Sequence, residues 1–275
     1  MNFTKRIYQF ALLSAVLACF SIAFAEDVSL TTRTYPTDVG KNGLPAGKTY
    51  CDLTADDRLF VTEYNAQLYF TTSADLVVPI FISGNSYGTE KTGKFRLQNN
   101  NVVVNINGPV TLEGDTAIGS HTNNDTGEIH FNNQITGSGA LVIGSGMTNK
   151  VYLNNTTGNA NNYTGNTQIG ENGMYINPAS GMVYLSAGEQ IPNGANAGNL
   201  VMLNSSTFYM QGYSETVNGL NSADVNSTID AGTGAAATLT VGDNNASGAF
   251  AGKLTGNMNL VKTGTGEQIL SGTNS

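Results

Sequence analysis

The run Leu260-Val-Lys-Thr-Gly-Thr-Gly-Glu-Gln-Ile-Leu-Ser-Gly-Thr-Asn-Ser275 decides how this chain folds, because a degenerate copy of its opening stands upstream at Leu141-Val-Ile-Gly-Ser-Gly. Each copy follows a similar lead-in, Ile135-Thr-Gly-Ser-Gly-Ala and Leu254-Thr-Gly-Asn-Met-Asn. A chain that reuses a strand-turn-strand unit, with glycine wherever it must bend, is most simply built as a stack of such units. The sequence therefore predicts an all-β stack in which each unit covers the next.

Composition favours many short strands over a disordered or helical chain. Of the 275 residues, 40% are hydrophobic, 12% are charged, 33 are glycine and none is tryptophan. This hydrophobic share is too high for disorder, which needs low hydrophobicity and high net charge. No window after residue 25 keeps an amphipathic helical period for three turns, and the glycine-dense turns also oppose helix.

Residues 1–25 resemble a bacterial Sec signal peptide. Lys5 and Arg6 form a basic start, residues 11–22 are mostly apolar, and Ala23-Phe-Ala25 is an A-x-A cleavage site before acidic Glu26. We therefore expect the Sec export machinery to be a partner and the chain to be cut between Ala25 and Glu26.

Two alternatives to this cleavage remain open. An uncleaved membrane anchor is opposed by the apolar core, which is shorter than the roughly 20 residues that a span needs. A lipoprotein signal ending at Cys19 is opposed by the bulky Leu17, which stands where such motifs favour a small residue. Neither alternative fits as well as the A-x-A site, so no transmembrane segment is expected in the mature chain.

The charge distribution argues against nucleic acid as a partner. With residues 1–25 removed, 10 basic residues face 20 acidic ones, a net charge of −10, and Arg96 is the last arginine. Such a surface repels phosphate backbones and anionic lipid. Cys51 is then the only cysteine of the mature chain, and a buried spectator thiol or an intermolecular disulfide is the expected role.

After the signal peptide, two regions differ in the length of their strand-like runs and in the composition between them. Residues 26–108 hold the longer strand-like runs 58–64, 67–72 and 76–82, the last with Pro79 inside, which predicts an edge or a bulge. We interpret this region as a β-rich N-terminal cap. Residues 109–275, with a border strand at 102–106, hold short strands between Gly, Asn, Ser and Thr, at 110–112, 128–131, 140–143, 150–153, 174–176, 182–185, 199–203, 207–210, 237–241 and 259–261.

These short strands favour a parallel arrangement over an antiparallel sandwich. Hairpins of a sandwich need two-residue links, and Asn172-Gly and Asn218-Gly are the candidates, but most links here are longer and irregular. Each strand is therefore expected to pair with the next coil of the stack. Asparagine is expected to hold left-handed turn positions and to stack in ladders between coils.

The C-terminal run resembles the autotransporter-associated β-strand repeat, also called the passenger-associated transport repeat. The residues that carry the likeness are Leu260, Lys262, Gly264, Gly266, Leu270, Ser271, Gly272 and Asn274. The downstream half of that repeat, a Tyr-x-Gly-x-Thr-x-Ile run, is matched at Tyr163, Gly165 and Thr167. The resemblance covers roughly residues 109–275 and implies a right-handed parallel β-helix, or β-solenoid, carried outside the inner membrane.

Two departures from the repeat bear on this expectation. Residues 141–155 lack the lysine and the Leu-Ser-Gly of the motif, so that copy is diverged. The best copy also stops at Ser275, where the repeat calls for a Tyr-x-Gly-x-Thr-x-Ile strand. We therefore expect a chain cut off mid-repeat, with fraying after about Gly252 or end-to-end association of two chains.

Carboxylates in this sequence do not form a recognisable catalytic set. Asp56 and Asp57 are adjacent and would face opposite sides of a strand, whereas a catalytic pair must converge at roughly 5–9.5 Å. Glu113 and Asp115 flank a glycine and are expected in a solvated turn.

A metal site is conceivable from the histidines but not favoured. It would run from His121 through Asp125 and Glu128 to His130, yet the Thr- and Asn-rich spacing indicates a loop. The predictions are therefore no catalytic residues, no metal and no cofactor.

The function that we predict from the sequence is structural or adhesive. The chain would be an exported bacterial β-solenoid, resembling part of an autotransporter passenger, that is secreted or displayed at the cell surface and meets host or environmental glycans or proteins. The alternative is a carbohydrate-active β-helix enzyme, a polysaccharide lyase or hydrolase. The scarcity of basic residues after Arg96 opposes a lyase, which usually needs a cation to stabilise an enolate-like intermediate.

Overall fold

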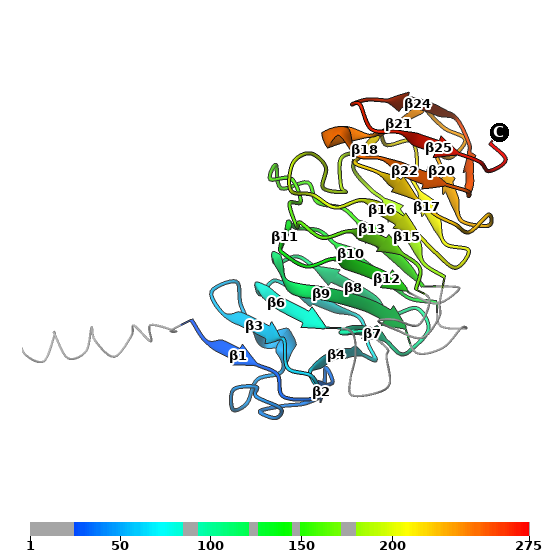
Figure 1. Cartoon of the computed structure of the whole chain (residues 1–275). Helices are drawn as coiled ribbons and strands as arrows, with labels where there is room; N and C mark the ends of the chain where they lie inside the picture. The colour runs from blue at the N-terminus through cyan, green and yellow to red at the C-terminus, as the bar shows by residue number, and fades with distance from the viewer. Residues whose placement is uncertain (1–24, 85–92, 121–125, 145–148, 172–179, 275) are drawn as a thin grey trace, which may run out of the picture.

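The computed structural model describes residues 25–84, 93–120, 126–144, 149–171 and 180–274 (Figure 1). Within these ranges the chain is all-β, and its only helical elements are two short 3₁₀ turns, η1 (Tyr50–Asp52) and η2 (Asp243–Asn245). The prediction of an all-β chain with almost no helix is confirmed. No helix among the described residues is long and apolar enough to cross a membrane.

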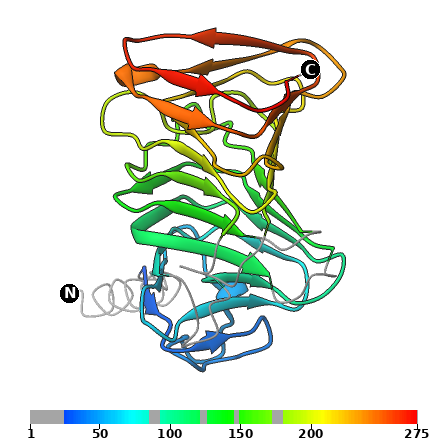
Figure 2. The same cartoon turned by 45° about the vertical axis from the view of Figure 1, so that its right-hand side comes forward.

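Two long parallel sheets run along the molecule (Figures 1 and 2). The eight-stranded sheet has the order β23 (Lys253–Thr255), β20 (Thr228–Asp230), β17 (Thr207–Tyr209), β15 (Met182–Leu185), β13 (Lys150–Leu153), β10 (Glu128–Phe131), β8 (Val103–Ile106) and β5 (Ala74–Leu76). Every pair of neighbours in this sheet is parallel.

The twelve-stranded sheet is parallel as well. Its main path is β1 (Asp27–Ser29), β3 (Arg58–Val61), β6 (Ile80–Gly84), β9 (Val110–Ser120), β12 (Leu141–Gly144), β14 (Thr167–Ile169), β16 (Leu200–Met202) and β19 (Leu220–Asn221). Four more strands join it beside this path: β2 (Arg33–Thr34), β4 (Gln67–Phe70), β7 (Phe95–Leu97) and β11 (Ile135–Gly137). The sheets continue across residue 108, because β6 pairs with β9 and β5 pairs with β8.

Two smaller parallel sheets complete the C-terminal end. One contains β18 (Glu215–Val217), β21 (Ala237–Val241) and β24 (Met258–Lys262), and the other contains β22 (Gly248–Phe250) and β25 (Gln268–Leu270).

The chain alternates between sheets as it advances. Strands β8, β10, β13 and β15 belong to the eight-stranded sheet, whereas β9, β12 and β14, which separate them in the sequence, belong to the twelve-stranded one. Each described strand therefore pairs with a strand two or three elements away and never with its sequence neighbour. An antiparallel sandwich would pair sequence neighbours through hairpins, so that alternative is wrong for the described residues.

The core lies between the sheets and follows from the alternation within each strand. In the eight-stranded sheet the second residue of successive strands points inward and is at most 2% exposed, as at Val104, Ile129, Val151, Val183 and Phe208. These residues stand directly opposite one another in the parallel register. Because the side-chain period of a strand is two, the residues on either side of each face outward.

Glycine and asparagine allow the close turns between strands. A Cβ atom added to Gly139 would lie 1.9 Å from the carbonyl oxygen of Gly114, so backbone segments meet where a side chain cannot fit. Among the described residues, six asparagines have positive φ: Asn42, Asn101, Asn196, Asn204, Asn244 and Asn245. The prediction that asparagine holds left-handed turn positions is confirmed.

Two predictions about local structure are wrong. The run 76–82 is not one strand: it divides between β5 and β6, which lie in different sheets, and Pro79 stands in the break. Proline has no N–H for a ladder, but its carbonyl accepts from Leu59 N at 2.9 Å. Glu113 and Asp115 lie not in a turn but within β9, where a register shift opposite Ile82–Gly84 accommodates the extra residues.

Of the two roles predicted for Cys51, the buried thiol is wrong, and the intermolecular disulfide stays a prediction. Cys51 lies in η1 and is exposed. Partial desolvation and then the charge of Asp52 raise the pKa of its thiol to about 11, so the unreactive protonated form dominates near neutral pH.

Candidate functional site

The outward face of the eight-stranded sheet carries a continuous row of stacked rings. The third residue of four successive strands supplies them: His130 in β10, Tyr152 in β13, Tyr184 in β15 and Tyr209 in β17. Their ring centroids are 4.3, 5.0 and 4.4 Å apart in that order, with interplanar angles of 8°, 28° and 14°. We call these four residues the ring ladder.

The register of the parallel strands positions the ring ladder. His130 stands opposite Tyr152, Tyr152 opposite Tyr184, and Tyr184 opposite Tyr209. Strand neighbours in a sheet are about 4.8 Å apart, which is close to the separation that stacked rings prefer. The ladder is therefore a direct consequence of repeating one ring position at each level of the stack.

Stacking decides which ring atoms a ligand can reach. The faces of Tyr152 and Tyr184 are covered by the rings above and below them, and all four residues are half-buried. The parts of these rings that stacking does not cover are their edges and the phenolic hydroxyls of the tyrosines. The ladder is therefore suited to hydrogen bonding along the stack and unsuited to stacking a flat ligand on an inner ring.

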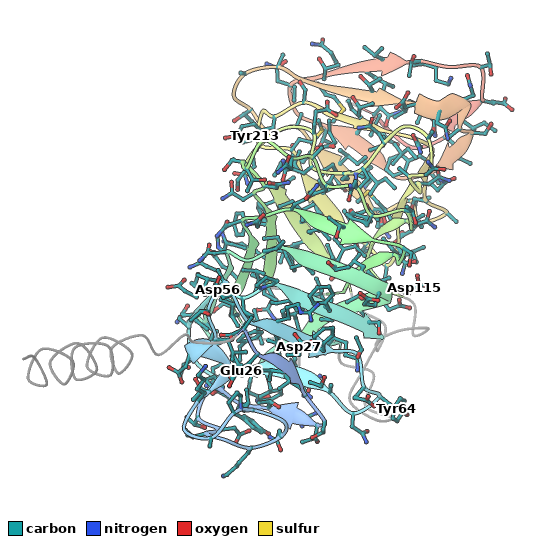
Figure 3. The ribbon with its side chains drawn as sticks, turned by 90° about the vertical axis from the view of Figure 1, so that its left-hand side faces the viewer. Glu26, Asp27, Asp56, Tyr64, Asp115 and Tyr213 are labelled. Atoms are coloured by element: carbon teal, nitrogen blue, oxygen red, sulfur yellow. The ribbon has the colours of Figure 1, made fainter. Side chains whose placement is uncertain are left out.

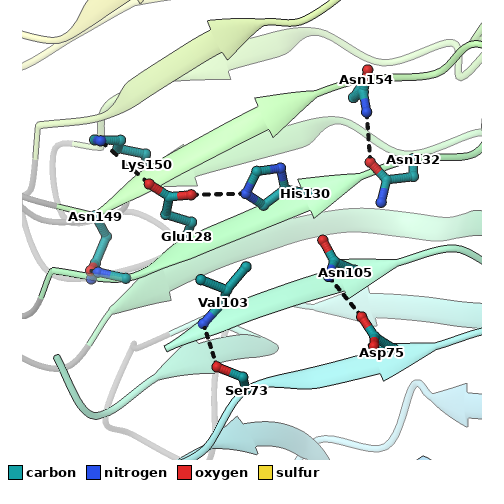
Figure 4. A network of polar contacts seen from close by, with 11 residues as sticks. Ser73, Asp75, Val103, Asn105, Glu128, His130, Asn132, Asn149, Lys150 and Asn154 are labelled. Carbon is teal, nitrogen blue, oxygen red and sulfur yellow. Dashed lines mark hydrogen bonds and ion pairs between the residues drawn. The ribbon is translucent and has the colours of Figure 1, made fainter. Parts of the chain in front are cut away.

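A small ion-pair network lies at the N-terminal end of the ladder (Figure 4). Glu128 accepts from His130 Nε2 at 3.0 Å and from Lys150 Nζ at 3.3 Å. Partial burial acts to raise the pKa of Glu128, but the hydrogen bonds and charges of His130 and Lys150 outweigh it and lower the pKa below its usual value. The Lys150 ammonium also lies 5.7 Å from the centroid of the Tyr184 ring, so this network is continuous with the ladder.

A ladder of amides runs beside the rings. Asn132 donates to Asn107 at 2.9 Å. Asn154 donates to Asn132, also at 2.9 Å (Figure 4). Below the ladder, Asn105 donates to Asp75 at 2.7 Å, one level apart. The predicted stacking of asparagine between coils is confirmed at these positions.

A second polar network is buried in the core near β18. Both carboxyl oxygens of Glu215 accept backbone N–H groups, Oε2 from Gln190 at 3.0 Å and Oε1 from Ile191 at 2.9 Å. Burial raises the pKa of Glu215 to about 8, although these two donors act in the opposite direction. Gln190 continues the network by accepting from Asn155 N at 2.7 Å. Glu215 is 0% exposed, so we assign it to structure and not to substrate contact.

The carboxylates considered from the sequence do not converge. Asp56 is exposed, whereas Asp57 is buried and accepts from backbone groups. Glu113 and Asp115 both lie on an outward face of β9, where Asp115 accepts from Ala140 N at 2.9 Å.

Part of the metal arrangement considered from the sequence cannot be placed. His121 and Asp125 lie outside the described residues. The described residues contain no group of three or more His, Cys, Asp or Glu side chains placed to hold a metal ion.

The residues that carry the repeat resemblance make hydrogen bonds both locally and between levels. Tyr163 is buried and its hydroxyl lies 2.5 Å from Thr167 Oγ1. Asn274 accepts from Leu254 N at 3.0 Å, and Ser271 N donates to Phe250 O at 3.0 Å. The four motif glycines each face a neighbouring backbone at distances that exclude a Cβ atom: Gly165, Gly264, Gly266 and Gly272.

The remaining motif residues lie at the last level. Leu260, in β24, stands opposite the buried Leu239 and is 42% exposed, and Leu270, in β25, packs partly on the core. Lys262 donates from Nζ to the carbonyl of Thr263 and, at 3.0 Å, to that of Gly264. At the predicted cleavage site, Ala25 and Glu26 are described and Ala23 lies outside the described residues.

A shallow groove of about 480 Å³ lies on another face, toward the C-terminal end. Val201, Ala249 and Phe250 supply its apolar surface, and Asn221 and Ser222 supply polar atoms. Its lining residues include no titratable side chain, so the groove itself offers no acid or base that could activate the hydroxyl of Ser222 or Ser271.

Comparison with protein-family models, curated proteins and solved structures gives no match. The candidate site therefore rests on the geometry of this chain alone.

The four strands of the ring ladder share one local pattern in the sequence, but this pattern does not predict that the rings stack. Glu-Ile-His-Phe at 128–131, Lys-Val-Tyr-Leu at 150–153, Met-Val-Tyr-Leu at 182–185 and Thr-Phe-Tyr-Met at 207–210 share the order outward, apolar, ring, apolar. The unequal lengths of the intervening segments concealed the alignment. Only the strand register places the four rings in one row.

Proposed function

We propose that this chain is an exported bacterial protein with a structural and adhesive role, and that its stacked strands form a right-handed parallel β-solenoid like that of an autotransporter passenger. The parallel pairing of strands that are two or three elements apart supports the solenoid. The repeat resemblance of residues 260–274 supports the handedness and the passenger-like role. The A-x-A site before Glu26 supports Sec export with cleavage after Ala25 and a secreted or surface location.

The single observation that carries the adhesive role is the ring ladder. It presents phenolic hydroxyls of Tyr152, Tyr184 and Tyr209 at successive levels, with Lys150 and Glu128 beside them. A ligand with regularly repeated hydroxyl or amide groups can contact several levels at once. Many weak contacts along one rigid row then give useful avidity without a deep pocket.

The ligand class that fits this surface is a glycan chain or an extended protein segment without strong negative charge. The mature chain carries a net charge of −10, which repels polyanions. Recognition is expected to depend on hydroxyl groups and not on ring faces, because the inner faces are already stacked. The protein would act by binding and display, not by catalysis.

A binding experiment with matched variants tests this function. The purified protein is incubated with a panel of immobilised neutral and acidic polysaccharides and extracellular proteins. Replacing Tyr152, Tyr184 and Tyr209 together by phenylalanine keeps the stack and removes the hydroxyls, and Tyr213→Phe is the control, since Tyr213 is 42% exposed and outside the ladder (Figure 3). We expect at least about a tenfold loss of affinity in the triple variant and none in the control. Unchanged binding by the triple variant would contradict the proposed site.

A further inference from the structure

The first residue of the predicted mature chain lies against a buried carboxylate. Glu26 N donates to Asp57 Oδ1 at 3.0 Å, and Glu26 comes directly before β1 at the N-terminal end of the stack, where Figure 3 marks it. Asp57 is only 3% exposed. The nitrogen that cleavage after Ala25 would release as an amine therefore already contacts a buried carboxylate.

The surroundings of Asp57 fix its orientation. Its Oδ2 accepts from Thr54 N at 2.8 Å and from Thr54 Oγ1 at 2.9 Å, within a turn closed by Asp57 N and Thr54 O at 3.2 Å. Its Oδ1 is directed at Glu26. The carbonyl of Glu26 in turn accepts from Arg58 N at 2.8 Å, so both ends of this residue are held.

The side-chain cations near Asp57 pair with other carboxylates. The Thr54 backbone hydrogen bond lowers the pKa of Asp57, burial opposes this, and the Glu26 N–H and Lys48 also lower it, so the acid is ionised at neutral pH. Lys48 pairs with the Glu26 side chain at 3.3 Å, Arg58 pairs with Asp27, and Asp56 is exposed. Within the described part of the chain, no side-chain cation forms an ion pair with Asp57.

We infer that Asp57 is the binding site for the α-ammonium group of the processed chain. The inference rests on the cleavage after Ala25 in the proposed function. Water hydrolyses the Ala25–Glu26 peptide bond, Ala25 leaves as a carboxylate, and the released Glu26 amine takes up a proton. The nitrogen need not move, because it is already 3.0 Å from Asp57 Oδ1, and an amide hydrogen bond becomes an ion pair with a buried carboxylate.

The consequence is that processing stabilises the folded state. Strand β1 is an edge strand whose pairing with β3 holds the N-terminal end of the stack. A charge-assisted bond at Glu26, directly before β1, favours the paired state, whereas the unprocessed chain has only an amide N–H there. Removal of the signal peptide is therefore expected to stabilise the N-terminal end of the stack.

Acetylation of the new N-terminus gives a matched test. A chain that begins at Glu26 with a free α-amine is compared with the same chain carrying an α-acetyl group, which restores the amide N–H and removes the charge. At pH 7 we expect an unfolding equilibrium constant about tenfold smaller for the free amine, which corresponds to a rise of about one unit in its pKa on folding. In Asp57→Asn the difference between the two N-termini should disappear, and an equal difference in both backgrounds would overturn the inference.

The pH dependence has a defined sign. The α-amine has a pKa of about 8 in an unfolded chain, and the ion pair raises it in the folded state. The advantage of the free amine is therefore fully present from about pH 8 down to the acidic pH at which Asp57 takes up a proton, and it is lost as the pH rises through the higher folded value of the amine.

A second measurement covers the case in which Asp57→Asn does not fold. The α-amine of isotopically labelled Glu26 is titrated by NMR in the otherwise unchanged protein, and a pKa of about 8 or lower would overturn the inference. N-terminal sequencing of the exported protein separately tests the cleavage. An N-terminus elsewhere would refute the proposed processing, while the amine titration would still decide whether Asp57 can bind an ammonium group at this position.

Discussion

Tyr184→Ala tests whether the ring ladder contributes to the stability of the stack. Tyr184 has rings on both sides, Tyr152 at 5.0 Å and Tyr209 at 4.4 Å, and the Lys150 ammonium at 5.7 Å. Aromatic pairs contribute about 0.5–1.5 kcal/mol each beyond area burial, and an exposed cation-π contact contributes about 0.5–1 kcal/mol. Together with the lost burial of a half-buried ring, we expect a decrease of about 2–4 kcal/mol in the free energy of unfolding.

Urea unfolding followed by circular dichroism measures this decrease, and two variants make it specific. Tyr213→Ala removes an exposed tyrosine that has no place in the ladder and should change stability by less than about 0.5 kcal/mol. Tyr184→Phe keeps the stacking and should lie within about 1 kcal/mol of the wild type. If Tyr184→Ala costs no more than Tyr213→Ala, the rings do not support one another and the ladder is not a stabilising unit.

Three further predictions follow from contacts elsewhere in the stack. In thermal melts, Gly139→Ala should destabilise the protein by more than about 2 kcal/mol, because the added Cβ would lie 1.9 Å from a backbone oxygen. The control Gly234→Ala should be close to neutral, because no atom lies within 4 Å of the added Cβ and Gly234 has no positive φ. Asn132→Ala removes two amide hydrogen bonds and should cost about 1–2 kcal/mol in denaturant unfolding, and a cost near zero would contradict the amide ladder. Burial raises the pKa of Glu215 to about 8 in the folded state, compared with about 4.3 in an unfolded chain. Between these pH values the folded state binds more protons than the unfolded state, so the free energy of unfolding should decrease as the pH rises from 5 to 8. Glu215→Gln should remove this dependence of stability on pH.

Much of the strand pattern could be predicted because local alternation decides it. The predicted strands at 128–131, 150–153, 182–185 and 237–241 coincide with β10, β13, β15 and β21. In each of them apolar residues alternate with outward residues between turn-forming segments, so local propensity and burial agree. The break at Pro79 was missed because an apolar run looks the same whether it stays in one sheet or crosses to another.

The candidate site could not be predicted because it depends on register. His130 and Tyr209 are far apart in the sequence, and no spacing rule brings them into one row. The contact between Glu26 and Asp57 likewise depends on the parallel pairing of β1 with β3. Sequence alternation predicts which residues face outward, but the lengths of the intervening loops decide which of them become neighbours.

The parallel register itself can be measured directly by disulfide formation between β17 and β20. With Cys19 and Cys51 replaced by serine, one variant carries cysteines at Thr207 and Thr228, which are opposite in the parallel register, and another at Thr207 and Asp230, which are diagonal. Opposite positions are about 4.8 Å apart, within the range that a disulfide spans, whereas diagonal positions lie about 7–8 Å apart. The parallel stack predicts that the monomeric protein forms the disulfide readily in the Thr207–Thr228 variant and poorly in the Thr207–Asp230 variant. The reverse result, which antiparallel pairing of these two strands would give, would contradict it.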